Sequence, residues 1–219
     1  MTKKIVCLGA YGSGKSEYAT NLAISFANCT IVDLDVVNPY FRTRYLGDLF
    51  QGHGVNLIAP TASLKYADVP IILPQIAGAI VEKNRSIVLD VGGQVAGSRV
   101  IAQFAHLIKS QNFEVRLIVN THRPDTDTRD KILMLIDNLQ ISSKLTISHI
   151  VANINLMEYT TLELVEKGIK SLVEVAKKRQ LILKHYLVER VISKGFPKQI
   201  LGVKKVEIDR YFRKPWEQS

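Results

Sequence analysis

The sequence predicts an α/β fold in three layers, with helices on both faces of a mostly parallel central sheet of about seven strands. Three observations support this prediction. Short apolar segments alternate along the chain with segments of helical periodicity, as βαβ units require. The apolar segments are nearly continuous, which is typical of strands covered on both faces. A glycine-rich motif follows the first of them and precedes the first helical segment.

Strands are predicted wherever a short run of apolar or β-branched residues lies between turn signals. These runs are residues 4–8, 30–34, 55–58, 86–89, 114–119, 146–151 and 181–188. Helices are predicted where apolar residues recur at three- and four-residue spacing. These segments are 17–27, 42–50, 74–83, 98–110, 127–139 and 161–179. A long loop over residues 59–73 contains two prolines, and long loops in compact domains are often functional.

Residues 9–16, Gly-Ala-Tyr-Gly-Ser-Gly-Lys-Ser, match the phosphate-binding loop pattern G-x-x-x-x-G-K-[ST] in full. The glycines let the backbone approach phosphate oxygens, and the amides that follow lie at the positive end of a helix. In this pattern the lysine reaches the β- and γ-phosphates and the final hydroxyl binds Mg²⁺. We therefore assign Lys15 a catalytic role. The predicted nucleotide-binding residues of this loop are Tyr11, Gly12, Ser13, Gly14, Lys15, Ser16 and Glu17.

The second predicted strand ends in Asp33 and Asp35, which alternation along a strand places on the same side. Both are expected beside the phosphate loop, because ligands of an open α/β sheet bind beyond the carboxyl ends of the strands. Asp33 is predicted to hold the hydration shell of Mg²⁺. Asp35 is predicted to be catalytic, orienting a water or accepting a proton from a substrate hydroxyl. The alternative is that Asp35 caps the turn before Asn38 and Pro39.

The fourth predicted strand ends in Asp90, and a Gly92-Gly93 pair follows soon after. An apolar run that closes in Asp is the expected second half of a phosphate-loop site. The glycines let the chain pass close to a γ-phosphate. A plain glycine-rich turn capped by the aspartate is the alternative. The predicted metal ligands are Ser16, Asp33 and Asp90.

Amide side chains follow the sixth predicted strand at Asn153 and Asn155. An amide pairs with the edge of adenine through one donor and one acceptor, so both residues are predicted to bind the base, Asn153 first. His122, after the fifth predicted strand, is expected to be a loop histidine rather than a ligand or base.

Composition places the chain among ordinary globular proteins, with 47% hydrophobic and 22% charged residues. No apolar run approaches the roughly 20 residues that cross a membrane, so no membrane partner is expected. The first strand begins at residue 4, leaving no room for a signal peptide, so a cytoplasmic location is expected. Cys7 and Cys29 are expected to be small buried residues and lie in no metal-ligand spacing.

The formal net charge is +9, and residues 160–219 hold 14 Lys and Arg against 7 Asp and Glu. An acidic partner such as nucleic acid is one interpretation of this excess. A solvated basic face is favoured, because no aromatic residues interleave the cations as they do on stacking surfaces.

Together, these motifs resemble those of the CobQ/CobB/MinD/ParA-like class of P-loop nucleotide-binding proteins, over about residues 3–180. The run Val-Asp-Leu-Asp-x-x-Asn-Pro-Tyr-Phe-Arg at residues 32–42 is similar to that of poorly characterised bacterial and archaeal members. The resemblance implies a P-loop NTPase fold that binds ATP or ADP with Mg²⁺. It implies Lys15 on the phosphates, Ser16 on the metal, Asp35 near the attacking water and Asn153 at adenine. We expect residues 1–219 to be one nucleotide-binding domain, with an irregular C-terminal extension over residues 196–219.

One departure from this class is important. MinD- and ParA-like proteins usually carry a second lysine early in the phosphate loop, which reaches the partner's nucleotide across a dimer. Ala10 occupies that position, so a homodimer of this kind is in doubt. If hydrolysis is fast, another cation must stabilise the transition state, by analogy with arginine fingers. The predicted candidates are Arg42, Arg44 and Arg99.

These residues favour an ATP-binding protein with slow Mg²⁺-dependent ATPase activity, acting as a switch or helper for a protein partner. A first alternative is a kinase that transfers the γ-phosphate to a polynucleotide or small hydroxyl compound, with Asp35 as base and the 59–73 loop as acceptor site. A second is a non-catalytic nucleotide-binding module. GTP is less favoured, because a guanine site usually needs an Asn-Lys-x-Asp run that this chain does not supply.

Overall fold

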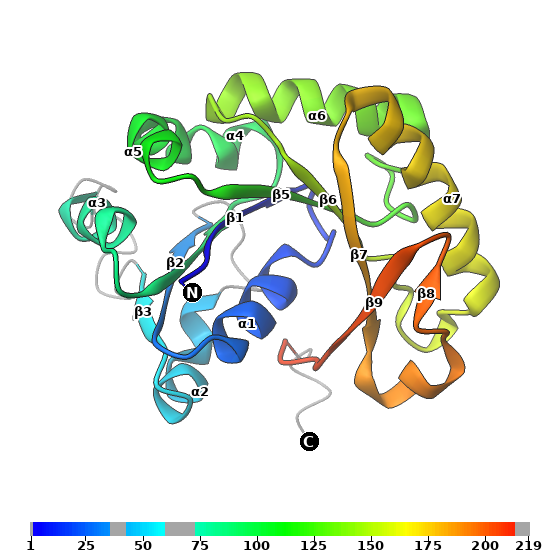
Figure 1. The fold of residues 1–219 in the computed structure, drawn as a ribbon, viewed down its shortest axis with the longest axis horizontal. Coiled ribbons are helices and arrows are strands. Elements are labelled where there is room, and N and C mark those ends of the chain that lie inside the picture. Colours follow the sequence, from blue (N-terminus) through cyan, green and yellow to red (C-terminus); the bar gives the residue numbers. More distant parts are fainter. Residues whose placement is uncertain (1, 36–42, 60–72, 213–219) are drawn as a thin grey trace.

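The computed structural model describes residues 2–35, 43–59 and 73–212, which form one sheet with helices on both of its faces (Figure 1). The strands are β1 (Lys4–Gly9), β2 (Cys29–Leu34), β3 (Asn56–Ile58), β4 (Ser86–Val91), β5 (Glu114–Val119), β6 (His149–Ala152), β7 (Ile182–Glu189), β8 (Gln199–Ile200) and β9 (Val203–Ile208). The order across the sheet is β3-β2-β4-β1-β5-β6-β7-β9-β8. All neighbours pair in parallel except β8, which is antiparallel to β9. The predicted α/β class and mostly parallel sheet are therefore confirmed, with nine strands in the described ranges rather than seven.

Helices and turns connect the strands much as the apolar periodicity predicts. The helices are α1 (Lys15–Ser25), α2 (Gly47–Gly52), α3 (Leu73–Val81), α4 (Gln94–Ser98), α5 (Ala105–Ser110), α6 (Arg129–Ser143) and α7 (Leu162–Arg179). The 3₁₀ turns are η1 (Thr43–Leu46), η4 (Val100–Phe104), η5 (Met157–Tyr159) and η6 (Arg190–Gly195). The two longest helices begin at threonine caps, where Thr128 and Thr161 each accept a backbone N–H of the first turn.

Two predictions about the elements were wrong. The helix predicted over residues 98–110 is broken, because residue 98 ends α4 and the rest forms two separate pieces, η4 and α5. The segment from residue 196, expected to be irregular, contains β8 and β9. Strand β9 escaped detection because lysines and a glutamate interrupt its apolar residues. A strand near the edge of a sheet tolerates such residues, since part of its surface faces water.

The core lies in two layers, one on each face of the sheet. The larger layer packs Ile101, Leu139 and Leu172 and their neighbours against the sheet, and the smaller layer contains Tyr18 and Phe50. Both cysteines, Cys7 and Cys29, are buried and unpaired, as expected. Within the described ranges, every helix is too short or too polar to cross a bilayer.

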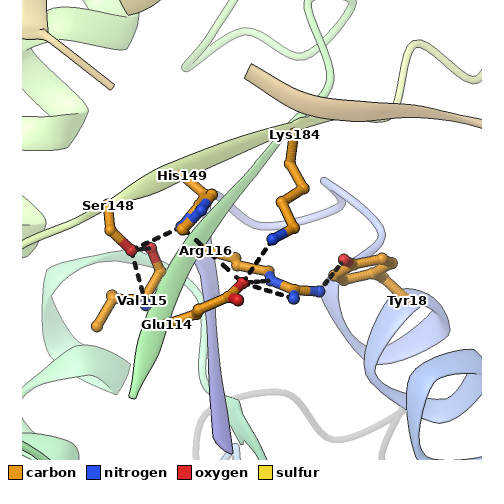
Figure 2. Close-up of polar contacts among 7 residues, drawn as sticks. All are labelled: Tyr18, Glu114, Val115, Arg116, Ser148, His149 and Lys184. Atoms are coloured by element: carbon orange, nitrogen blue, oxygen red, sulfur yellow. Dashed lines mark hydrogen bonds and ion pairs between the residues drawn. The ribbon is translucent and has the colours of Figure 1, made fainter. Parts of the chain in front are cut away.

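A polar cluster joins α1 to the sheet beneath it (Figure 2). The Arg116 guanidinium on β5 donates to the Tyr18 hydroxyl at 2.6 Å and to Glu114 Oε2 at 2.9 and 2.6 Å. Lys184 Nζ on β7 donates to the same carboxylate oxygen at 3.0 Å. Although partial burial opposes it, hydrogen bonding from Arg116 and Lys184 lowers the pKa of Glu114 to about 2. The cluster therefore fixes α1 relative to two strands of the sheet.

We expect Glu114→Gln to lower the free energy of unfolding at neutral pH by about 1–3 kcal/mol, because the buried Arg116 guanidinium loses its anionic partner. The folded-state pKa of Glu114 lies below its ordinary value of 4.5. Its contribution is therefore present above that pH and is lost as the pH falls towards about 2.

Urea unfolding of the wild type and the variant at a series of pH values checks this expectation. The difference in unfolding free energy should be largest near neutral pH and shrink below the ordinary pKa of the carboxyl. Glu166→Gln, on an exposed position of α7, is the matched control and should change the free energy by less than about 0.5 kcal/mol. A difference that stays constant with pH would contradict the role given to the Glu114 carboxylate.

Candidate nucleotide-binding site

A cavity of about 540 Å³ lies at the carboxyl ends of the strands. This volume is within the range of roughly 300–1,000 Å³ that is usual for small-molecule sites. The loops after β1, β2, β5, β6 and β9 contribute to its walls, together with Glu189 at the end of β7. The predicted site residues that line it are Tyr11, Gly12, Gly14, Lys15, Ser16, Glu17, Asp35, Asn153 and Asn155.

The phosphate loop has the left-handed backbone that its glycines permit. Gly14 has φ 86°, and an added Cβ there would lie 2.1 Å from Asn153 Nδ2. Both the backbone angle and the close neighbour therefore require glycine. The side chain of Ser13 is fully buried, and its hydroxyl lies 2.7 Å from where a Cβ of Gly9 would be. The Ser13 side chain therefore packs inside the loop and does not line the cavity.

Lys15 is the first residue of α1, and its side chain is buried with only 6% exposed. Its Nζ donates to the Ala10 carbonyl oxygen at 3.0 Å. Burial lowers the pKa of Lys15, and the nearby Asp90 and Asp35 carboxylates oppose that change. A Cβ on Gly93 would lie 3.2 Å from Lys15 Nζ, so the loop after β4 runs directly against the ammonium group.

Asp33 on β2 and Asp90 on β4 are register partners and are both fully buried. Burial, together with the Asp33 charge, raises the pKa of Asp90 to about 7. The Thr43 hydroxyl donates to Asp90 Oδ2 at 2.5 Å. Asp90 Oδ1 is buried and has no hydrogen-bond partner among the described residues. Hydrogen bonding from the Thr43 and Ser16 side chains opposes this rise in the Asp90 pKa.

These groups fit the Mg²⁺ that the sequence predicts. Carboxylate and hydroxyl oxygens are the ligands that Mg²⁺ prefers, with waters and phosphate oxygens completing an octahedron. Asp90 Oδ1 is an acceptor without a partner among the described residues, at the strand end where the metal is predicted. Ser16, Asp90 and Asp33 would therefore hold the ion or its waters.

Asp35 lies at the phosphate end of the cavity. Its backbone N–H donates to Asp33 Oδ1 at 2.9 Å, which orients the chain after β2. A Cβ on Gly92 would lie 2.9 Å from Asp35 Oδ1, so this carboxylate borders the loop after β4. The alternative prediction is that Asp35 caps a turn before Asn38 and Pro39. Those two residues lie outside the described residues.

The two asparagines predicted to bind adenine already make bonds within the protein. Asn153 Nδ2 donates to the Ser13 carbonyl oxygen at 2.7 Å, which joins the loop after β6 to the phosphate loop. Asn155 accepts the Met157 N–H at 2.6 Å and donates to Glu189 Oε1 at 3.1 Å. Both residues line the cavity, but Asn153 faces the phosphate loop. Their contact with a base stays a prediction.

Glu17 turns towards the C-terminal part of the chain. Its carboxylate accepts the backbone N–H groups of Tyr211 at 2.6 Å and Phe212 at 3.2 Å. Burial raises the pKa of Glu17 to about 7, although these two bonds oppose the change. The residue that follows Ser16 therefore holds a segment nearly 200 positions away in the chain.

Of the three predicted cations, Arg99 alone has a side chain that the structure describes. Arg99 lines a separate groove between α4 and α6. Arg42 and the side chain of Arg44 lie outside the described residues. The cavity is instead bordered by Arg123, whose Nε donates to the Gly12 carbonyl oxygen at 2.9 Å. Its place at the carboxyl end of β5, next to His122, is the sequence signal that points to Arg123.

Two other expectations concern His122 and the loop over residues 59–73. His122 is half-buried in the loop after β5, and burial lowers its pKa, in keeping with a loop histidine. The 59–73 loop predicted as an acceptor site lies outside the described residues except at its two ends. Thr43 was missed as a partner of Asp90, because a single hydroxyl in a polar run carries no distinctive sequence signal.

The fold, the loop at residues 9–16 and the surrounding acids define a protein of the P-loop NTPase fold. No family model matches the chain, and no curated protein matches it significantly. Similar solved structures include cell division protein FtsY from Thermotoga maritima, at 14% identity and TM-score 0.56, covering 86% of this chain and 62% of that one.

Two further similar structures contain GDP. One is the signal recognition particle receptor FtsY from Elizabethkingia anophelis, at 14% identity and TM-score 0.57, covering 86% of this chain and 58% of that one. The other is signal recognition particle 54 kDa protein from Aeropyrum pernix K1, at 18% identity and TM-score 0.56, covering 92% and 43%. The chain spans less than two thirds of the length of each of these proteins, and likeness at such identities shows the fold alone.

We expect Asn153→Ala to weaken the binding of triphosphate groups about fivefold to tenfold, because the phosphate loop loses one supporting hydrogen bond. The loss should be the same for ATP, GTP and inorganic tripolyphosphate, each measured by calorimetric titration with Mg²⁺. Asn138→Ala, at an exposed position of α6, is the control and should change nothing. A loss confined to ATP would instead show that Asn153 reads adenine, as the sequence predicts.

Proposed function

We propose that this chain is a single nucleotide-binding domain that binds ATP with Mg²⁺ and hydrolyses it slowly, as a switch or helper for a partner protein. The main support for this proposal is that Lys15, Asp35 and the Gly92-Gly93 loop lie together at one end of the cavity. A cation, a carboxylate and close backbone are the groups that phosphoryl transfer to water requires there.

Each residue has a distinct role in the proposed reaction. Lys15 Nζ exchanges its bond to the Ala10 carbonyl for the β- and γ-phosphate oxygens, a stronger charge-assisted contact. The loop amides bind the remaining oxygens at the start of α1. Asp35 orients a water for in-line attack beside Gly92. Thr43 fixes the Asp90 carboxylate, which would hold Mg²⁺ where its charge would offset that of the phosphates.

ATP is proposed over GTP on two grounds. The motifs resemble the CobQ/CobB/MinD/ParA-like class, which implies ATP, and the loop after β6 supplies amides rather than an Asn-Lys-x-Asp run. Similar structures of FtsY and of the 54 kDa protein are complexes with GDP. Both nucleotides are therefore needed in every test.

The first experiment compares the wild type with Lys15→Ala and Asp35→Ala. We expect Lys15→Ala to weaken nucleotide binding more than tenfold, because the phosphates lose a buried cation. We expect Asp35→Ala to bind nucleotide nearly normally and to release phosphate at less than about a tenth of the wild-type rate. Lys170→Ala, on an exposed position of α7, serves as the control.

Binding is measured by titration and turnover by phosphate release, each with and without a polynucleotide. Unchanged binding by Lys15→Ala would refute the site. Label transfer to the polynucleotide, without release in its absence, would identify a kinase. Binding without turnover, in the presence of candidate partners, would leave a nucleotide-binding module.

Arg123 is proposed to supply the cation that Ala10 does not. Its Nε bond to the Gly12 carbonyl holds the guanidinium on the outside of the phosphate loop, at the cavity wall.

We expect Arg123→Ala to lower phosphate release at least tenfold with little change in nucleotide affinity, because an arginine of this kind acts on charge that develops in the transition state. Single-turnover and binding measurements separate the two effects, with Arg129→Ala on α6 as control. An equal loss in affinity would contradict this role.

A further inference from the structure

The chain that follows β9 returns to the nucleotide cavity. Strand β9 pairs in parallel with β7, from Tyr186 beside Lys205 to Glu189 beside Ile208, so it ends at the same edge of the sheet as the phosphate loop. In Figure 1 the red segment after β9 ends next to α1. Residues 209–212 are called the C-terminal strap here. They are the last residues that the structure describes.

Two side chains of α1 hold the backbone of the C-terminal strap. Asn21 Nδ2 donates to the Asp209 carbonyl oxygen at 2.8 Å, and the Asp209 N–H donates to Asn21 Oδ1 at 2.8 Å. One helical turn nearer the phosphate loop, the Glu17 carboxylate accepts the N–H groups of Tyr211 and Phe212. These four bonds involve strap backbone alone, so they set the path of the strap without engaging the Phe212 ring.

The docked strap forms part of the cavity wall. Arg210 and Phe212 line the cavity together with Ile208, the last residue of β9. Leu156 and Met157, from the loop after β6, line it as well, and Arg210 Nη1 lies 3.8 Å from Met157 Sδ. The strap therefore meets the loop after β6 across the part of the cavity that Lys15 and Asp35 do not occupy.

This part of the cavity differs in chemistry from the phosphate end. Its walls include an aromatic ring and three aliphatic or thioether side chains, with Arg210 and Glu189 as charged groups. A planar heterocycle stacks on aromatic rings and contacts apolar side chains with its faces, while its edges need polar partners. These are the properties of a nucleobase, and the phosphate loop fixes where the phosphates of the same molecule lie.

We propose that the C-terminal strap forms the base-binding wall of the nucleotide site, with Phe212 stacking on the base and Arg210 beside it. Glu17 and Asn21 are positioning residues that dock the strap. This inference rests on the proposed nucleotide binding and extends it to the base. Because Glu17 follows Ser16 directly, the helix turn that contains the predicted metal-binding hydroxyl also holds the strap.

The test compares the full chain with its Phe212→Ala and Asn21→Ala variants. Each is titrated in the presence of Mg²⁺ with ATP, with GTP and with inorganic tripolyphosphate, which has no base. Both variants are expected to bind the nucleotide preferred by the wild type at least about fivefold more weakly, because stacking on one aromatic ring contributes that much or more. Their affinity for tripolyphosphate should stay within about twofold of the wild type. Asn138→Ala is the matched control for Asn21→Ala.

A second readout follows the strap itself. Amide hydrogen exchange at Tyr211 and Phe212 should slow when the wild type binds nucleotide and should not slow with tripolyphosphate. Nucleotide affinity unchanged in both variants, with no change in exchange, would overturn the strap inference and leave nucleotide binding intact. A wild type that binds neither nucleotide nor tripolyphosphate would overturn the proposed function and this inference with it.

Discussion

The burial of Lys15 among carboxylates is the constraint on which the rest of the site depends. An ammonium group this deeply buried is costly unless anions and hydrogen-bond acceptors surround it. Asp35, Asp90 and the Ala10 carbonyl supply that environment. Their positions follow from the parallel sheet, since the strands that carry them end at one edge. Asp33 adds a further buried acid, so the site has more acidic than basic side chains and suits a divalent cation.

Helix α1 connects the phosphate loop to other parts of the molecule. Its first residue is Lys15, and its Tyr18 hydroxyl bonds to the buried Arg116 guanidinium on β5. On the outer side, Glu17 and Asn21 hold the segment after β9. Three sets of polar contacts thus meet on the first two turns of one helix.

The positions of the residues predicted for the phosphate end follow from local rules. A loop between a strand and a helix, with Gly14 at positive φ and Lys15 after it, is determined by neighbouring residues. Asp33, Asp35 and Asp90 follow apolar runs that can only be buried strands, so their convergence at the sheet edge follows from topology. The seven predicted strands are present for the same reason.

The other parts of the fold and of the site depend on contacts between residues far apart in the chain, which no pattern in one sequence reveals. Nothing local shows that Asn153 supports the Ser13 carbonyl, or that Thr43 bonds to Asp90. Strand β9 has an unremarkable mixture of apolar and charged residues and becomes a strand because β7 offers it a parallel edge. The break in the helix predicted over residues 98–110 is similar, since a periodic apolar face is compatible with helical pieces as well as with one helix.

The phosphate end and the base end of the site are built differently, and this difference affects how the site selects its ligand. The phosphate end is built from one continuous loop, and substitutions such as a larger residue at Gly14 meet backbone strain and the Asn153 amide at once. The base end is assembled from separate segments that include Met157 and Phe212, and the Glu17 carboxylate of α1 accepts the backbone N–H of Phe212. Side chains there are free to change without disturbing the bonds that hold the segment. Phosphate binding and base selection are therefore separable properties of this fold, and they can be altered one at a time.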